Sequence, residues 1–242
     1  MKKYIIATTA LLVVATSAFS QGLVNFSAGT SVATRMSTNS VVGGPSTGTT
    51  AATSGLYYYA LFASVNQTAI NGSSTAISGL SANYVFRNLG TGIPSTGWEL
   101  VGIGTNYASA GRMFPASQGT TSAGQAALNA DNSLTVQGIG GAANANLVAV
   151  GWYSPGIGAT LASLQTWYAA GANNGWIGQS AVGNLTLGDG GLVVTPGIFG
   201  TGAGQVGGFM MGLTSATAVP EPGTLALMAL GSASLLLFRR KK

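Results

Sequence analysis

Three carboxylates are the only acidic side chains in the long middle of this chain, which makes them its first candidates for chemistry. They are Glu99, Asp131 and Asp189. Two facing carboxyl groups, one of them with a raised pKa, are the machinery of a glycosidase. However, Asp131 stands beside an asparagine and Asp189 lies between two glycines, and these neighbours favour turns. We therefore expect two turn residues, and a Glu99 that pairs with an arginine or faces water.

The residue types that are missing narrow the chemistry further. The chain has no cysteine and no histidine, which excludes Ser-His-Asp triads, Cys-His pairs, zinc sites built on these residues and disulfides. Residues 202–207 have the glycine spacing of a dinucleotide-binding loop, but the segment after them is glycine-rich, and the next acidic residue is Glu221 of the proline motif near the C-terminus. We expect no cofactor, no metal and no enzymatic activity; an unusual hydrolase is the remaining enzymatic alternative.

The last two dozen residues combine a short proline motif, an apolar run and a block of positive charge. In order they are Val219, Pro220, Glu221 and Pro222, then residues 223–238, then Arg239, Arg240, Lys241 and Lys242. The two prolines fix φ and remove two backbone donors, so the motif stays extended. The apolar run predicts a transmembrane helix that is slightly shorter than the ~17–25 residues of a full span. The long side chains of the arginines after it can reach the membrane interface and so extend the span.

The positive charges at the C-terminus predict how the chain is oriented in the membrane. The terminal cations stay cytoplasmic, and everything before Val219 then lies outside. The N-terminus agrees, because Met1-Lys2-Lys3, an apolar stretch at 5–14 and small residues at Ala18 and Ser20 predict a signal peptide that is cleaved before Gln21.

Residues 219–242 resemble the PEP-CTERM sorting signal of exported bacterial surface proteins. This resemblance implies recognition by an exosortase, an integral-membrane, cysteine transpeptidase-like protease that cuts near the Pro-Glu-Pro. It also implies an inner-membrane intermediate and a final place at the cell surface or in the extracellular matrix. Families with this tail are linked to exopolysaccharide and biofilm production. An ordinary anchor that is never cleaved is the alternative.

The charge of the middle region excludes one class of partner. Six of the nine cations lie in the two ends, and between Gln21 and Val219 three arginines balance three carboxylates. Binding to nucleic acid requires clustered Lys and Arg to neutralise phosphates. We expect no nucleic-acid partner.

The 38 glycines are interrupted by aromatic and aliphatic clusters, a pattern typical of a β domain with many turns. The unbroken apolar run at 55–65 predicts a strand that is covered on both faces, and residues 146–153 predict a second strand. Residues 160–170 predict one helix, which Thr160 caps and Gly171 ends. Shorter strands are expected at 22–27, 84–87, 98–103, 134–136, 176–178, 185–187 and 209–211.

These elements predict a mainly β protein, a β-sandwich of jelly-roll or immunoglobulin-like type with one short helix. A signal helix and a transmembrane helix flank it. The expected divisions are a signal peptide at 1–20, an ectodomain at 21–213, a linker with the sorting motif at 214–222, a transmembrane helix at 223–238 and a basic tail at 239–242.

The expected function is a non-enzymatic structural or adhesive role at the cell surface or in the matrix, with exopolysaccharide as a partner beside the exosortase. A carbohydrate-binding module is the alternative function, because aromatic rings stack on sugars. Most rings should fill the core. The candidates for glycan contact are Trp98, Trp152 and Trp176.

Overall fold

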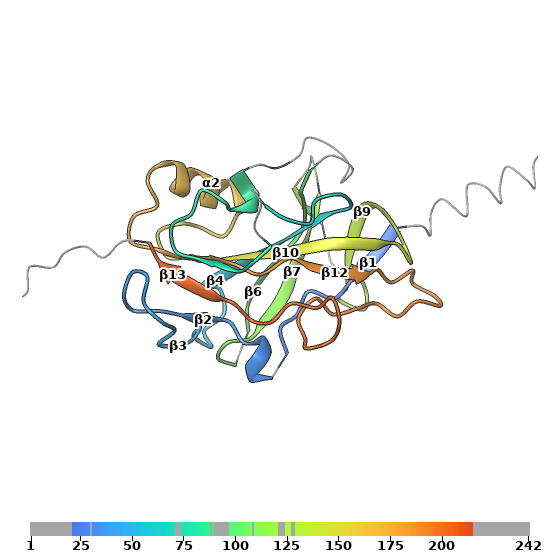
Figure 1. Cartoon of the computed structure of the whole chain (residues 1–242), viewed down its shortest axis with the longest axis horizontal. Coiled ribbons are helices and arrows are strands. Elements are labelled where there is room, and N and C mark those ends of the chain that lie inside the picture. The colour runs from blue at the N-terminus through green and yellow to red at the C-terminus, as the bar shows by residue number, and fades with distance from the viewer. Residues whose placement is uncertain are drawn as a thin grey trace, which may run out of the picture.

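The body of the protein is built from β-strands and one α-helix, as predicted (Figure 1). The computed structural model describes residues 21–29, 31–70, 74–87, 89, 97–107, 109–120, 124–126 and 129–214. The predicted signal peptide and the sorting tail lie outside this part of the chain. Within it, no helix is both long enough and apolar enough to span a bilayer.

The strands form one long sheet and one two-stranded sheet. Order in the long sheet is β3-β2-β13-β11-β10-β4-β6-β7-β8, with β12 also paired to β10 and β5 to β11, while β1 pairs with β9. The bounds are β1 Gln21–Val24, β2 Ser37–Thr38, β3 Gly48–Thr49, β4 Tyr57–Ser64, β5 Ile77–Ser78, β6 Glu99–Asn106, β7 Met113–Thr120, β8 Gly124–Ala126, β9 Leu134–Gly140, β10 Asn144–Tyr153, β11 Trp176–Gln179, β12 Gly183–Thr186 and β13 Met210–Leu213. The helices are η1 Val32–Thr34, η2 Val85–Arg87 and α2 Leu161–Ala169.

The antiparallel pair β4–β10 runs through the middle of the long sheet. The two strands are in register over eight residues, from Tyr57 opposite Tyr153 to Ser64 opposite Asn146. Successive side chains of a strand point to opposite faces, and here both faces are buried. Tyr59 and Leu61 enter one hydrophobic cluster, while Ala60 and Phe62 enter another. The prediction that the strand at 55–65 is covered on both faces is therefore confirmed.

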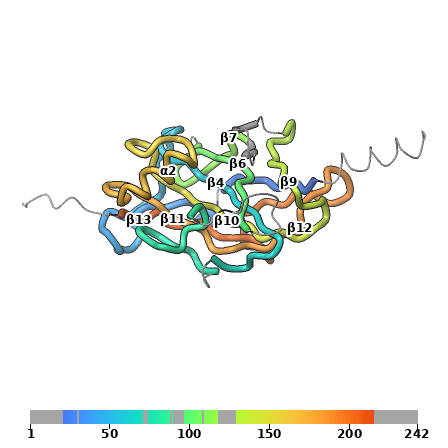
Figure 2. The backbone as a smooth tube through the Cα atoms, turned by 90° about the horizontal axis from the view of Figure 1, so that it is seen from above, coloured from blue at the N-terminus to red at the C-terminus, as the bar shows by residue number. Residues whose placement is uncertain are grey.

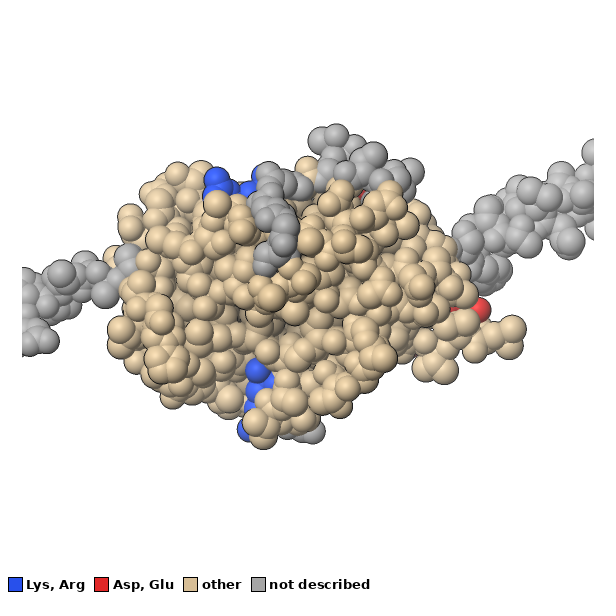
Figure 3. Space-filling view, in the orientation of Figure 1, with Lys and Arg blue, Asp and Glu red and all other residues tan. Residues whose placement is uncertain are grey.

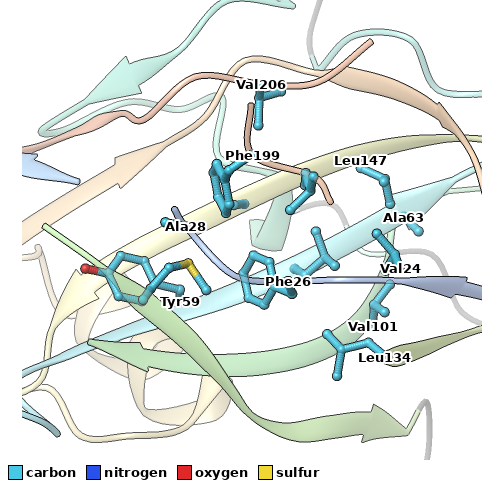
Figure 4. Close-up of a cluster of buried hydrophobic side chains, with 14 of the residues drawn as sticks. Val24, Phe26, Ala28, Tyr59, Ala63, Val101, Leu134, Leu147, Phe199 and Val206 are labelled. Atoms are coloured by element: carbon cyan, nitrogen blue, oxygen red, sulfur yellow. The ribbon is translucent and has the colours of Figure 1, made fainter. Parts of the chain in front are cut away.

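The first cluster fills the space between the long sheet and the β1–β9 sheet (Figure 4). Val24 and Phe26, from β1 and the residues after it, share this cluster with Leu134 from β9, Tyr59 from β4 and Phe199 from the segment after β12. Close approach requires glycine here, because a Cβ at Gly151 would lie 2.8 Å from Cδ1 of Tyr59 and 3.0 Å from Sδ of Met211.

The opposite face of the long sheet carries α2 and η2, which lie together above the plane of the sheet (Figures 1 and 2). Leu164 of α2 is fully buried against Trp152 and Phe86 in the second cluster. The helix begins where it was predicted to begin, since Thr160 and Ser163 form a capping box. Its last residue, Ala169, lies one position short of the expected end.

One short strand was predicted wrongly. Residues 85–87 form the 3₁₀ helix η2 instead, with the Arg87 amide donating to the Tyr84 carbonyl. The Val85 amide donates to Oε1 of Gln179 at 2.8 Å. A side chain 94 residues away thus takes the place of a neighbouring strand as hydrogen-bond partner. Residues 37–54 contain the two-residue strands β2 and β3, which the sequence does not predict.

Candidate functional site

Two of the three carboxylates accept hydrogen bonds from residues of the turns in which they lie. Oδ1 of Asp131 accepts hydrogen bonds from the amide and the hydroxyl of Ser133. Oδ1 of Asp189 accepts from the amides of Gly191 and Val193. These bonds favour the ionised forms and lower both pKa values, chiefly through Ser133 for Asp131 and through Val193 for Asp189. Both residues have the turn geometry that the sequence predicts.

Glu99 departs from the prediction. It is 5% exposed at the start of β6, and within the described part of the chain its Oε1 has no hydrogen-bond partner. The residue is therefore largely buried instead of facing water, and its Oε1 pairs with no arginine of the described ranges. Burial raises its pKa above the ordinary value. A general acid needs such a shift, but it also needs access to substrate, which this buried oxygen lacks.

The three tryptophans that were the candidates for glycan contact fill the interior or its margin. Trp98 is 3% exposed, and Trp152 is fully buried with Nε1 donating to the Gly158 carbonyl at 2.8 Å. Trp176 is half-buried, and its Nε1 donates to the Asn39 carbonyl at 2.7 Å. A sugar could stack on Trp98 or Trp152 only if the core opened.

A groove of about 410 Å³ lies between η2 and α2. It is lined by Phe86, Arg87, Gln165, Tyr168 and Ala169. The Arg87 guanidinium lies over the Tyr168 ring, 5.6 Å from its centroid, and Nε2 of Gln165 donates to the Phe86 carbonyl. The sequence analysis missed this combination because its members come from two elements that meet only in the folded chain.

Arg87 carries one of the few charges on this molecule. The space-filling view shows isolated patches of blue and red on an otherwise uncharged face (Figure 3). No carboxylate within the described ranges pairs with Arg87, and the side chain is exposed. A guanidinium in this state is available to an anionic ligand.

The second site is the place where the chain leaves the body toward the sorting motif. β13 lies between β11, with which it is antiparallel, and β2, with which it is parallel. The Leu213 amide donates to Oδ1 of Asn39 at 2.7 Å, and Nδ2 of Asn39 donates to the Gly44 carbonyl at 3.0 Å. Asn39 is only 2% exposed. We call this arrangement the exit clasp.

Thr214 completes the exit clasp. Its amide donates to the Gly175 carbonyl at 2.9 Å, and its hydroxyl donates to the same oxygen at 3.0 Å. The chain is therefore fixed by backbone and side-chain hydrogen bonds up to the last described residue. Only five residues, 215–219, separate it from Pro220.

Comparison with known proteins identifies the segment after the exit clasp. Residues 218–241 match the PEP-CTERM protein-sorting motif, in agreement with the resemblance seen in residues 219–242. No curated protein and no solved structure matches the chain. The predicted cleavage residues Ala18 and Ser20 and the residues of the sorting motif lie outside the described part, whereas Gln21 is the first residue of β1.

Replacing Glu99 should change the dependence of stability on pH. Because the folded-state pKa is raised, protonated Glu99 stabilises the fold fully below the ordinary value of 4.5, and this contribution disappears as pH rises through the folded-state pKa. We expect Glu99→Gln to be more stable than the wild type at pH 7 by about 1 kcal/mol, with the advantage vanishing on acidification.

Urea unfolding of both proteins from pH 3 to pH 7 measures this difference. The lowered pKa values of Asp131 and Asp189 act in the opposite direction, but they affect both proteins equally and cancel. A difference in unfolding free energy that stays constant with pH would contradict the assignment.

Removing the Asn39 side chain should loosen the exit clasp. Asn39→Leu leaves the Leu213 amide without its acceptor, which costs about 1 kcal/mol. Hydrogen exchange followed by mass spectrometry should show faster exchange in residues 210–214. Asn39→Asp keeps the acceptor and should retain more protection, while Ser40→Ala at the exposed neighbouring position should have no effect. Equal exchange in Asn39→Leu and Ser40→Ala would refute the role of the clasp.

Proposed function

We propose that this PEP-CTERM protein, an exported substrate of an exosortase, is a non-enzymatic structural or adhesive component of the cell surface or the extracellular polysaccharide matrix. The sorting motif at residues 218–241 is the observation that carries the proposal. It accounts for export and for a membrane-anchored intermediate that a membrane protease processes. The final location and the role in the matrix are our inference.

The position of the motif relative to the body supports this function. The exit clasp ends the body at Thr214, and the Pro-Glu-Pro begins six residues later. Pro220 and Pro222 hold the backbone extended and unpaired, which is the conformation that a protease cleft accepts. A folded body that ends this close to the cut site leaves little spare chain for nonspecific proteolysis.

The body itself suits a structural role. We infer a sandwich-like domain in which the β1–β9 sheet stacks on the long sheet through a shared apolar cluster. The assignment to a jelly-roll or immunoglobulin-like type stays a prediction. Three arginines and three carboxylates give this region a net charge of zero, so neighbouring copies do not repel one another in a dense matrix.

The expectation of no enzymatic activity stays part of the proposal. Two carboxylates are engaged in turns, and the third is buried at the start of β6. No group of three or more acidic, histidine or cysteine side chains that could hold a metal occurs in the described ranges. The fold thus keeps the three carboxylates in separate structural settings.

A carbohydrate-binding function is the second candidate, and the groove between η2 and α2 favours it. The groove is lined by aromatic rings, a side-chain amide and a guanidinium that pairs with no carboxylate of the described ranges. A sugar with a carboxylate group has a partner for each of them: its ring for the aromatic side chain, its hydroxyls for the amide and its carboxylate for the guanidinium. Tyr168 is held rigidly, because its hydroxyl donates to the Ser81 carbonyl and accepts from the Ser81 amide. The ligand would then be an acidic polysaccharide, and its contact residues would be Arg87 and Tyr168.

Replacing both motif prolines by alanine should block processing. Pro220→Ala with Pro222→Ala restores two backbone donors and frees φ, so the segment no longer stays extended. We expect the full-length chain to accumulate in the membrane of the native cell, as measured by immunoblotting of membrane and extracellular fractions.

The matched control is Pro155→Ala, a proline replacement in an exposed turn of the body. This variant should be processed like the wild type. Normal processing of the double variant would remove the support for recognition by an exosortase.

Retention on an immobilised acidic polysaccharide tests the second candidate. The wild-type chain should be retained, and Arg87→Ala should lose most of this retention because the only cation of the groove is gone. Arg35→Ala removes an exposed arginine of the segment between η1 and β2 and should bind normally. Equal retention of both variants, or no retention of the wild type, would argue against sugar binding in this groove.

A further inference from the structure

Exposed apolar side chains surround the point where the chain leaves the body. Val41 is 64% exposed and Val42 is 47% exposed in the turn between β2 and β3, and Leu80 is 56% exposed after β5. We call these three side chains the exit rim. Exposed valines and leucines occur singly on many proteins, so their position relative to the exit is what matters.

Contacts within the body place the exit rim around Leu213. Asn39 begins the turn that contains the two valines, and its side chain accepts the hydrogen bond of the Leu213 amide. The turn is closed by the bond from Asn39 to the Gly44 carbonyl. On the other side, a Cβ at Gly79 would lie 3.4 Å from the Leu213 carbonyl oxygen, and Leu80 is the next residue.

The surroundings of the exit rim carry no charge. Residues 36–44, 77–83, 172–179 and 209–214 contain no Lys, Arg, Asp or Glu. Figures 1 and 2 both place the blue turn between β2 and β3 at the same end of the body as β13. Burying this end against an apolar phase therefore removes no ionised side chain of these segments from water.

The short connection between the body and the apolar run determines which end of the body lies near the bilayer. Eight residues, 215–222, connect Thr214 to the apolar run 223–238. Fully extended, they reach roughly 30 Å, whereas a domain of this size is roughly 40 Å across. While the tail is in the membrane, the exit end thus has a much higher effective concentration at the bilayer surface than the far end.

We propose that the exit rim rests on the outer surface of the bilayer that holds the tail, before the tail is cut. The inference rests on the proposed function, because it requires a membrane-inserted tail. The occupant is the lipid surface, and the contact is weak by itself, since three side chains bury little area. It orients the body so that the Pro-Glu-Pro stays at the height of the membrane interface, where an integral-membrane protease acts.

The far end of the body provides an internal comparison. Leu192 is 97% exposed and Val194 is 85% exposed, more than any residue of the exit rim. They lie in the orange segment after β12, which Figures 1 and 2 place at the opposite end from β13. If exposure alone decided membrane contact, this end would touch the bilayer first. If the tail attaches the body to the membrane, the exit rim should contact the bilayer and the far end should not.

Site-specific labelling tests the proposal on the full chain, because the protein has no cysteine of its own. Val41→Cys, Leu80→Cys and Leu192→Cys are each labelled with an environment-sensitive fluorophore, and each protein is inserted into phosphatidylcholine vesicles that contain nitroxide-labelled lipid. We expect labels at positions 41 and 80 to emit at shorter wavelength and to be quenched by the nitroxide. The label at position 192 should remain unquenched, as in water.

The possible results separate the two proposals. If the chain floats with the vesicles but positions 41 and 80 behave like position 192, the contact of the exit rim is refuted and sorting through the tail stands. Quenching at all three positions indicates nonspecific adsorption and also refutes the contact. If the chain does not float with the vesicles, the membrane-inserted intermediate fails, and this inference fails with it.

Discussion

The pairing of β4 with β10 is the interaction on which the rest of the structure depends. Eight residue pairs hold the two strands together, and both faces of the pair are buried. One face supports the β1–β9 sheet and the other supports α2 and η2. The chain has no cysteine, so no disulfide stabilises this arrangement. Packing against this pair therefore has to supply most of the stability of the fold.

Sequence reasoning predicted the parts of the fold that are encoded locally. The unbroken apolar runs predicted β4 and β10, and the cap at Thr160 with a change of period predicted α2. It failed where a distant side chain decides the outcome. Gln179 satisfies the Val85 amide and turns an expected strand into η2, and Glu99 is buried although its neighbours in sequence are compatible with exposure. The two-residue strands β2 and β3 are too short to leave a pattern.

The functional features, like the elements of the fold, were predictable from the sequence only where they are encoded locally. Sorting could be predicted because a linear motif carries all of its information in 24 residues, 218–241. The exit clasp could not, because Asn39 and Leu213 are 174 positions apart and meet only through the parallel pairing of β2 with β13. The glycan candidates Trp98 and Trp152 were chosen by residue type, whereas the fold uses both rings to fill its interior. Arg87 and Tyr168, which do face a groove, come from segments that show no common motif.

Together these features describe a neutral, tightly packed body whose last described residue, Thr214, lies six positions before the Pro-Glu-Pro in the sequence. In the proposed function the tail is a temporary anchor that a membrane protease removes. Mass spectrometry of the C-terminus of the protein from its native cell decides whether the tail is removed. We expect a chain that ends near Pro220–Pro222 and lacks residues 223–242. An intact C-terminus at Lys242 on the protein at its final location would contradict this expectation.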